Sequence, residues 1–212
     1  MPKQQIMFKN YKGPKDWFLF EQRVRNEGAI LPAGIDEVGV GCLAGPVVAA
    51  AVILPQKISL PDINDSKKLS ENDRNRLYRE IVKLALSWGL GMVPPKIIDQ
   101  VNILKASLLA MKIAIGKLNP KPDFLLIDGR NSLPDLNIRQ KSIVKGDSRS
   151  ISIAAASILA KVSRDRLMKF YARKFPLYGF DQNKGYGTAF HREALQSNGP
   201  CSIHRYSYQG VC

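Results

Sequence analysis

The chain alternates between short apolar runs and longer segments in which apolar residues recur with a helical period. Short apolar runs that end near glycine or proline are typical of β-strands. Residues 47–54 are apolar throughout, which indicates a strand buried on both faces. The predicted strands cover residues 30–38, 47–54, 88–93, 124–127 and 142–144.

The longer segments predict helices, and several have recognisable ends. Ser70 and Asn102 are plausible N-caps, because their side chains can accept a hydrogen bond from a free backbone N–H of the first turn. Gly28 ends the first helix. The predicted helices cover residues 14–28, 70–87, 102–118, 152–174 and 188–196.

This order of elements predicts an α/β fold. We expect a mixed five-stranded sheet flanked by helices, followed by a small helical C-terminal part. Binding sites in such sheets lie at the ends of strands. The ends of the predicted strands are therefore the first places to look for functional residues.

Four carboxylates lie at predicted strand ends or in tight loops, each close to a glycine: Asp36, Glu37, Asp128 and Asp147. Brought together, they would repel one another strongly unless a cation lay between them. Oxygen ligands of this kind suit Mg²⁺ or Mn²⁺. Adjacent strand residues point to opposite faces, so Asp36 and Glu37 could share one cluster only if the strand bends. The glycines that follow would permit the bend.

The chain as a whole is strongly basic, in contrast to this acidic cluster. The 212 residues include 32 lysines and arginines against 18 aspartates and glutamates, a net charge of +14. Such an excess favours a polyanionic partner, above all a nucleic acid. A basic protein with an acidic, magnesium-type pocket indicates a nuclease that hydrolyses phosphodiesters with metal assistance.

Other classes are disfavoured. Cys42, Cys201 and Cys212 have neither CxxC spacing nor a histidine at ligand spacing, so we expect reduced thiols rather than disulfides or a zinc site. No signal-peptide core opens the chain, and the apolar run at 46–55 is too short to span a bilayer. We expect a cytoplasmic protein with no membrane contact.

The segment from Asp36 to Val47 reads DEVGVGCLAGPV. It resembles the first signature of the ribonuclease HII family, the type 2 ribonucleases H. The resemblance continues in family order from about Ile30 to Val211. The other matching segments are residues 65–70, 99–103, 126–129, 144–148, 153–162, 184–188 and 204–207.

The resemblance implies a ribonuclease H fold in which Asp36, Glu37, Asp128 and Asp147 are the catalytic, metal-binding acids. It implies an endoribonuclease of DNA replication and repair that uses Mg²⁺ or Mn²⁺. The implied substrates are RNA/DNA hybrids and duplex DNA containing a ribonucleotide. Cleavage on the 5′ side of the ribonucleotide leaves a 3′-hydroxyl and a 5′-phosphate. We hypothesise two metal ions, bridged by Asp36.

The resemblance also suggests an organisation of the chain. Residues 1–29 form a helical lead-in, residues 30–175 the catalytic domain, and residues 176–212 a part that completes the substrate cleft. Nothing in the sequence resembles a dedicated interface, so we expect a monomer without an obligate protein partner.

The family usually has arginine between the two glycines of its first signature, whereas this chain has Val40. The resemblance implies that Gly39, Val40 and Gly41 contact the ribose 2′-hydroxyl largely through their backbone, so recognition should persist without the guanidinium. It also implies that Tyr186 packs on the sugar beside the ribonucleotide. Ser66, Lys67 and Lys145 are candidates for phosphate contacts.

Each residue also has a plainer interpretation. Asp147 could cap the following helix, Asp128 could belong to an ordinary turn, and Tyr186 could be a packing residue. We expect His191 and His204 to be structural, and residues 163–166 to be an exposed helix face with local ion pairs. A DNA-junction resolvase of the same fold class and a hybrid-binding protein without cleavage remain as alternative functions.

Overall fold

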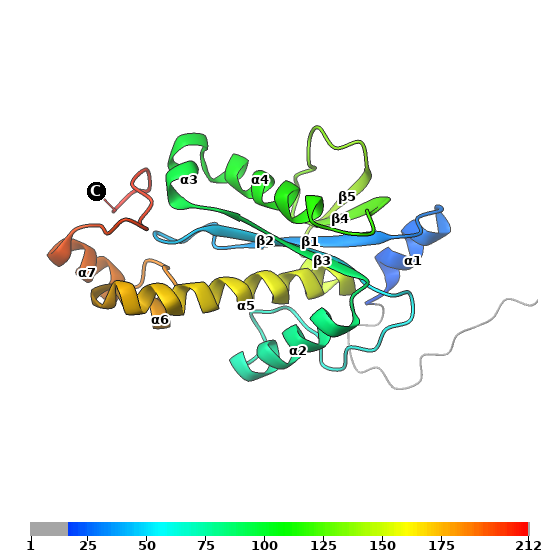
Figure 1. Ribbon diagram of the computed structural model, residues 1–212, viewed down its shortest axis with the longest axis horizontal. Helices are drawn as coiled ribbons and strands as arrows, with labels where there is room; N and C mark the ends of the chain where they lie inside the picture. Colours follow the sequence, from blue (N-terminus) through cyan, green and yellow to red (C-terminus); the bar gives the residue numbers. More distant parts are fainter. Residues whose placement is uncertain (1–16, 212) are drawn as a thin grey trace, which may run out of the picture.

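The computed structural model describes residues 17–211 and contains one mixed five-stranded sheet (Figure 1). Its strand order is β3-β2-β1-β4-β5. β1 is antiparallel to β2, and β2 to β3, whereas β1–β4 and β4–β5 are parallel. The predicted α/β fold is confirmed. The strands are β1 (Pro32–Val38), β2 (Val47–Ile53), β3 (Ser87–Val93), β4 (Phe124–Asp128) and β5 (Arg139–Ile143).

The predicted helices are confirmed, as are both predicted N-caps. The Ser70 side chain accepts a hydrogen bond from Asp73 N, and the Asn102 side chain accepts one from Lys105 N. Residues 14–16 of the first predicted helix lie outside the described residues. The helices are α1 (Leu19–Asn26), α2 (Glu71–Leu84), α3 (Pro95–Val101), α4 (Ile103–Gly116), α5 (Ile151–Lys174), α6 (Phe180–Asn183) and α7 (Ala189–Asn198), with 3₁₀ turns at Gly146–Ser148 and Pro176–Tyr178.

Helices cover both faces of the sheet, α4 on one and α5 on the other, with α2 packed against α5 (Figure 1). Each long helix approaches the sheet at a glycine. A Cβ at Gly34 of β1 would collide with the backbone of Ser152 in α5, and one at Gly91 of β3 would collide with the Ala110 carbonyl in α4. The missing side chains allow α5 to pack directly on β1 and α4 to pack directly on β3.

Some boundaries differ from the prediction for identifiable reasons. α2 ends at Leu84 rather than near Ser87, because the chain turns there to begin β3. β5 begins at Arg139, three residues before the predicted start. The prediction missed this part because exposed polar residues alternate along the edge strand and no apolar run marks it. α3 was not predicted, although it begins with a proline at its first position, which is a recognised helix start.

The C-terminal part lies at the end of the sheet that is farthest from α1 (Figure 1). There Ala44 and His204 form an antiparallel bridge. Gly45 N donates to Ile203 O (2.8 Å) and Arg205 N donates to Leu43 O (2.9 Å). The segment at residues 203–205 is therefore joined directly to the loop between β1 and β2.

The structure also bears on the expected state of the cysteines and on membrane-spanning helices. Cys42 and Cys201 are free thiols, whereas Cys212 lies outside the described part of the chain. Among residues 17–211, no helix combines the length and the apolar character needed to cross a membrane.

Candidate active site

The four predicted acids gather at one edge of the sheet. Asp36 and Glu37 lie near the end of β1, Asp128 is the last residue of β4, and Asp147 lies in the 3₁₀ turn after β5. Because β1, β4 and β5 are parallel, their carboxyl ends meet. Gly146 N donates to Asp128 Oδ1 (2.6 Å), which ties the loop carrying Asp147 to the end of β4.

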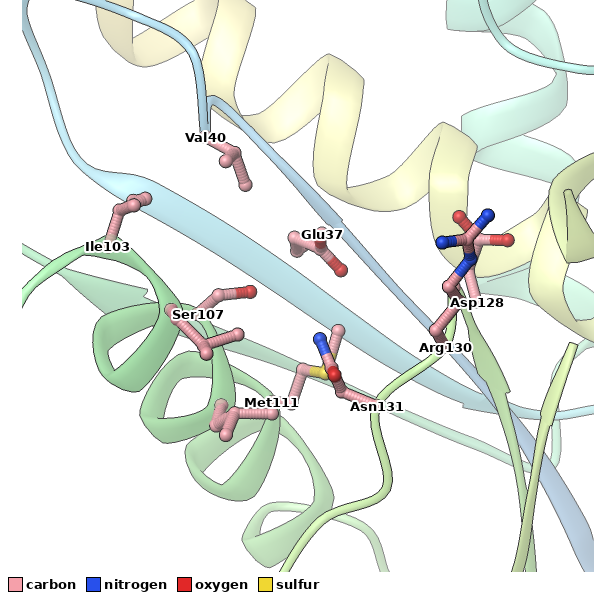
Figure 2. Close-up of a pocket in the computed structure, with 11 residues that line it drawn as sticks. Glu37, Val40, Ile103, Ser107, Met111, Asp128, Arg130 and Asn131 are labelled. Atoms are coloured by element: carbon pink, nitrogen blue, oxygen red, sulfur yellow. The ribbon is translucent and has the colours of Figure 1, made fainter. Parts of the chain in front are cut away.

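Asp36 and Glu37 point to opposite faces of β1, and the expected bend between them is absent. The pairing of β1 with β2 continues in register through Val38. Asp36 is 6% exposed on the α5 side, where Ser157 hydrogen-bonds its carboxylate. Glu37 instead lines a cavity on the α4 side (Figure 2). Asp128 interacts electrostatically with both carboxylates, so it links the two faces.

The acids are poorly compensated by positive charge. Burial raises the pKa of Asp36, with further contributions from Glu37 and Asp128. Burial and Asp128 raise the pKa of Glu37 to about 7. Burial also raises the pKa of Asp147, although Lys67 Nζ lies 3.6 Å from its Oδ2. The charged forms of Asp36, Glu37 and Asp147 are therefore less favourable here than in water, and a nearby cation would stabilise them.

This donor set fits a hard divalent cation, although no ready-made centre exists. Within residues 17–211, no three or more acidic, histidine or cysteine side chains are already arranged to hold a metal. Glu37 Oε2 is nevertheless buried and has no hydrogen-bond partner in the described part of the chain. Oxygen-only ligands with raised pKa values and an unsatisfied buried oxygen match the preferences of Mg²⁺ and Mn²⁺.

A cavity of about 220 Å³ adjoins the acids. Glu37 points into it from β1, and Ser107 and Met111 face it from α4 (Figure 2). Arg130 and Asn131 border it from the loop after β4 (Figure 2). We did not predict from the sequence that these two residues lie at the site. Their position directly after Asp128-Gly129, at the end of a predicted strand, could have indicated it.

The loop at Gly39–Gly41 is held from behind by a buried arginine. Arg205 has no exposed surface, and its guanidinium donates to the carbonyls of Gly39 (2.6 Å) and Val40 (2.8 Å). The Tyr208 hydroxyl donates to the same Val40 carbonyl (2.9 Å). Across a trans peptide the N–H points opposite to the C=O, so the N–H groups of Val40 and Gly41 face away from Arg205. Neither N–H has an acceptor among the described residues.

A second buried arginine supports the same region and corrects one prediction. Arg164 of α5 is fully buried and donates to the carbonyls of Pro46 (2.9 Å), Ala44 (3.0 Å) and Lys184 (2.7 Å). The expectation of an exposed face at residues 163–166 is therefore wrong for this residue. Gly39 has φ +93°, and a Cβ there would collide with the Arg164 guanidinium, so this position requires glycine.

Tyr186 lies in the loop between α6 and α7, with its side chain 40% exposed. The carbonyl of the preceding Gly185 accepts a hydrogen bond from Leu43 N (2.8 Å), three residues after Val40. Val40 itself is 39% exposed. The two loops are far apart in sequence but are joined by this backbone hydrogen bond. Each presents a partly exposed side chain, Val40 in the first loop and Tyr186 in the second.

The remaining candidates differ in accessibility. Lys67 and Lys145 are exposed. Ser66 is 3% exposed, and its hydroxyl lies 3.0 Å from Ser157 Oγ, in the interior behind Asp36. Contacts of all three with phosphate stay predictions. Asp147 does not cap α5, because the Ser150 side chain accepts from Ile153 N and fills that role.

Comparison with known proteins decides the family. A family model described as "Ribonuclease HII" matches residues 33–211. The chain belongs to the ribonuclease HII family. It is 57% identical to ribonuclease HII of Syntrophus aciditrophicus (strain SB) over 190 residues, covering 90% of this chain and 89% of that protein. It is 51% identical to ribonuclease HII of Bacillus subtilis (strain 168) over 192 residues, covering 91% and 74% respectively.

Solved structures share the fold. Ribonuclease H2 from Pyrococcus horikoshii OT3 aligns with a TM-score of 0.73 at 23% identity, covering 86% of this chain and 95% of that one. The ribonuclease HII chain of a PCNA complex from Archaeoglobus fulgidus aligns with a TM-score of 0.70 at 29% identity, covering 85% and 96%. Family membership makes the protein a nuclease of the ribonuclease H class.

Proposed function

We propose that this protein is a metal-dependent endoribonuclease that hydrolyses RNA in RNA/DNA hybrids and incises on the 5′ side of ribonucleotides embedded in duplex DNA. The products are a 3′-hydroxyl and a 5′-phosphate. One observation carries the proposal: β1 has two acids near its end, Asp36 buried and Glu37 partly buried, and the loop that follows has two backbone N–H groups without an acceptor among the described residues. Chemistry and ribose recognition can therefore act on neighbouring atoms of one nucleotide.

Asp36, Glu37, Asp128 and Asp147 would hold two Mg²⁺ or Mn²⁺ ions. When bound, the ions activate the attacking water and stabilise the leaving oxygen. A protein of the same fold, Bst-RNase HIII, has been described in complex with Mn²⁺, and it aligns with a TM-score of 0.66 at 20% identity. The support from this chain itself is the oxygen-only donor set with its unsatisfied Glu37 Oε2.

The protein prepares its ligands through hydrogen bonds to their carboxylates. Glu37 N donates to Asp36 Oδ1 (2.8 Å), and Ser157 binds the same carboxylate, so Asp36 is fixed in orientation. Gly146 N fixes Asp128. Lys67 partly neutralises Asp147 and is 80% exposed, so it is free to bind a substrate phosphate once a metal takes over that carboxylate. Such preset orientation lowers the cost of assembling the site.

Ribose recognition would use the backbone of the Gly39–Gly41 loop. The free N–H groups of Val40 and Gly41 can donate to a 2′-hydroxyl, which deoxyribose lacks. The side chain at position 40 takes no part in these hydrogen bonds, so valine in place of the family arginine removes a phosphate contact and leaves ribose reading intact. Tyr186 would pack on the adjacent deoxyribose.

The C-terminal part from residue 176 onward would complete the substrate cleft, because its segment at 203–205 supports the loop from behind. We propose a cytoplasmic monomer that acts without an obligate protein partner. The net charge of +14 supplies the long-range attraction to nucleic acid.

The test is cleavage of three duplexes in Mg²⁺ and in Mn²⁺: DNA with one ribonucleotide, a long RNA/DNA hybrid, and DNA alone. We expect incision 5′ to the lone ribonucleotide, cleavage of the hybrid and no cleavage of DNA. Cleavage of the DNA duplex would favour a resolvase. Binding to the hybrid without cleavage of any duplex would favour a binding protein.

A further inference from the structure

Two histidines are paired in the interior of the C-terminal part, away from the acids. His191 of α7 is 0% exposed and His204 is 1% exposed. Their Nε2 atoms lie 3.0 Å apart. The rings of Tyr178 and Phe180 pack around both imidazoles, with centroids 4.9 to 6.4 Å away. No charged side chain is hydrogen-bonded to either ring within residues 17–211.

The outer nitrogens of the pair determine where its protons lie. Cys201 N can only donate and lies 2.9 Å from His204 Nδ1, whereas the Cys201 carbonyl lies farther from that nitrogen, at 3.3 Å. The nearer group is the N–H, so we assign Nδ1 as the acceptor. His204 therefore carries its proton on Nε2 and donates it to His191 Nε2. His191 in turn carries its proton on Nδ1, which lies 2.9 Å from the Tyr186 carbonyl. The result is a one-way chain of hydrogen bonds from Cys201 to Tyr186.

This chain requires both rings to be neutral, because a second proton on either would set two N–H groups against each other. Burial lowers the pKa of His191, and burial together with His191 lowers the pKa of His204 to about 4. Both rings are therefore neutral near pH 7, which is the state that the hydrogen-bond chain needs.

We propose that His191 and His204 are positioning residues that set the orientation of Tyr186, and so contribute to recognition of the RNA–DNA junction. The inference rests on the proposed role of Tyr186. Its N–H donates to Asn183 O (2.9 Å), and its carbonyl accepts from Thr188 N (2.8 Å) as well as from His191. The backbone of Tyr186 is thus fixed on both sides, and its ring is aimed from a rigid base.

The position of His204 in the chain extends the argument. His204 reaches Tyr186 through His191, whereas the next residue, Arg205, holds the carbonyls of Gly39 and Val40. Two consecutive residues therefore support the two loops proposed to read the substrate. This arrangement fixes the distance between the loop that would contact the ribose and the ring that would contact the neighbouring deoxyribose.

The test uses two amide substitutions that separate the two ring nitrogens of His191. In His191→Asn, the side-chain amide can take the place of Nδ1 and still donate to the Tyr186 carbonyl. In His191→Gln, the amide takes the place of Nε2 and that donor is lost. The readout is the ratio of kcat/KM on a lone ribonucleotide in duplex DNA to kcat/KM on a long RNA/DNA hybrid. A long hybrid offers no deoxyribose at the site of Tyr186.

We expect His191→Gln to lower this ratio about fivefold, as for loss of one hydrogen bond, and His191→Asn to keep it within about twofold of the wild type. A general loss of stability would lower both activities together and leave the ratio unchanged. Tyr186→Ala is the reference variant, and it should lower the ratio at least as far as His191→Gln.

The outcomes separate this inference from the proposed function. If the wild type cleaves neither substrate, the proposed function fails. If Tyr186→Ala lowers the ratio and His191→Gln does not, the positioning role is overturned. Imidazole ¹⁵N NMR of the wild type gives a second test that needs no variant to fold. We expect a proton on Nδ1 of His191 and on Nε2 of His204, and any other tautomer pair contradicts the inference.

Discussion

The acid edge, formed by Asp36, Glu37, Asp128 and Asp147, differs from the adjacent Gly39–Gly41 loop in how its polar groups are paired, although β1 runs directly from one to the other. At the acid edge, charges are only partly compensated: Glu37 Oε2 has no partner within residues 17–211, and the pKa values of three carboxyls are raised. In the Gly39–Gly41 loop, two successive carbonyls are held by one buried guanidinium. The acids are thus only partly paired, whereas the carbonyls of Gly39 and Val40 both have charged donors.

The difference shows how each region depends on its ligand. Uncompensated carboxylates store repulsion that a bound cation relieves, so this edge gains stability only when loaded. The Gly39–Gly41 loop is proposed to distinguish ribose from deoxyribose, and for that role it would have to present its N–H groups in one direction. The hydrogen bonds from Arg205 fit such a fixed loop, whereas the partly paired acids fit a site completed by a metal.

Substitution of an acid should have the largest effect. We expect Asp147→Asn to lower kcat on an RNA/DNA hybrid by about 10³-fold or more, because metal stabilisation is worth several kcal/mol and each 1.36 kcal/mol is tenfold in rate. The same change should leave the melting temperature of the metal-free protein unchanged or raise it, since it removes repulsion. Asp135→Asn, at an exposed ion pair with Lys112, is the matched control and should retain full activity.

Substitution of Arg205, which holds the Gly39–Gly41 loop, should have the second-largest effect. We expect Arg205→Met to reduce the free energy of unfolding by about 3 kcal/mol, because buried carbonyls lose charged donors. Discrimination between ribose and deoxyribose should also weaken. Leu77→Ala is the matched control: this buried residue of α2 belongs to the core, so its truncation should destabilise the protein similarly without a contact to the loop. Equal loss of discrimination in both variants would contradict the assigned role of Arg205.

A pH titration tests the acid edge without altering the loop. The pKa of Glu37 is raised to about 7, so a metal must displace a proton below that pH. We expect the apparent affinity for Mg²⁺ to rise about tenfold from pH 6 to pH 8, measured by calorimetry. In the metal-free protein, stability should fall as pH rises from 4.5 towards 7, because the unfolded chain has already released this proton. Glu37→Gln should flatten both profiles.

The smallest effect should follow a change at position 40. We expect Val40→Arg to lower KM for the hybrid a few-fold and to steepen the salt dependence of binding by about one phosphate contact. The preference for ribose over deoxyribose should not change, because the N–H groups belong to the backbone. Val40→Ala should match the wild type in preference; a clear shift in either variant would mean that the side chain itself reads the sugar.

The acid edge was predictable from the sequence because its signals are local. Asp36 and Asp128 each follow an apolar run, and the parallel arrangement of β1 and β4 brings such positions together. The N-caps at Ser70 and Asn102 were equally local. The opposite orientations of Asp36 and Glu37 were also foreseeable from the strand period, but the bend expected to reunite them does not exist.

The supports of the loops could not be predicted in the same way. Arg164 lies in a run of polar residues that is typical of a solvated helix face, and its partners are backbone carbonyls up to 120 positions away. Backbone carbonyls occur at every residue, so no side-chain pattern marks which of them an arginine will meet. The facing of His191 and His204 likewise depends on how α7 docks against the C-terminal segment.

The hydrogen bonds from Arg205 to the loop join residues that are 165 and 166 positions apart in the chain. Contacts of such high sequence separation form late in folding, because loop closure must come first. The sheet and its acids can therefore be in place before the loop acquires its shape. Any transient detachment of residues 203–205 would release the loop while the sheet stays folded. Hydrogen exchange should register this as an opening of the C-terminal segment at lower free energy than the exchange of β1 and β2.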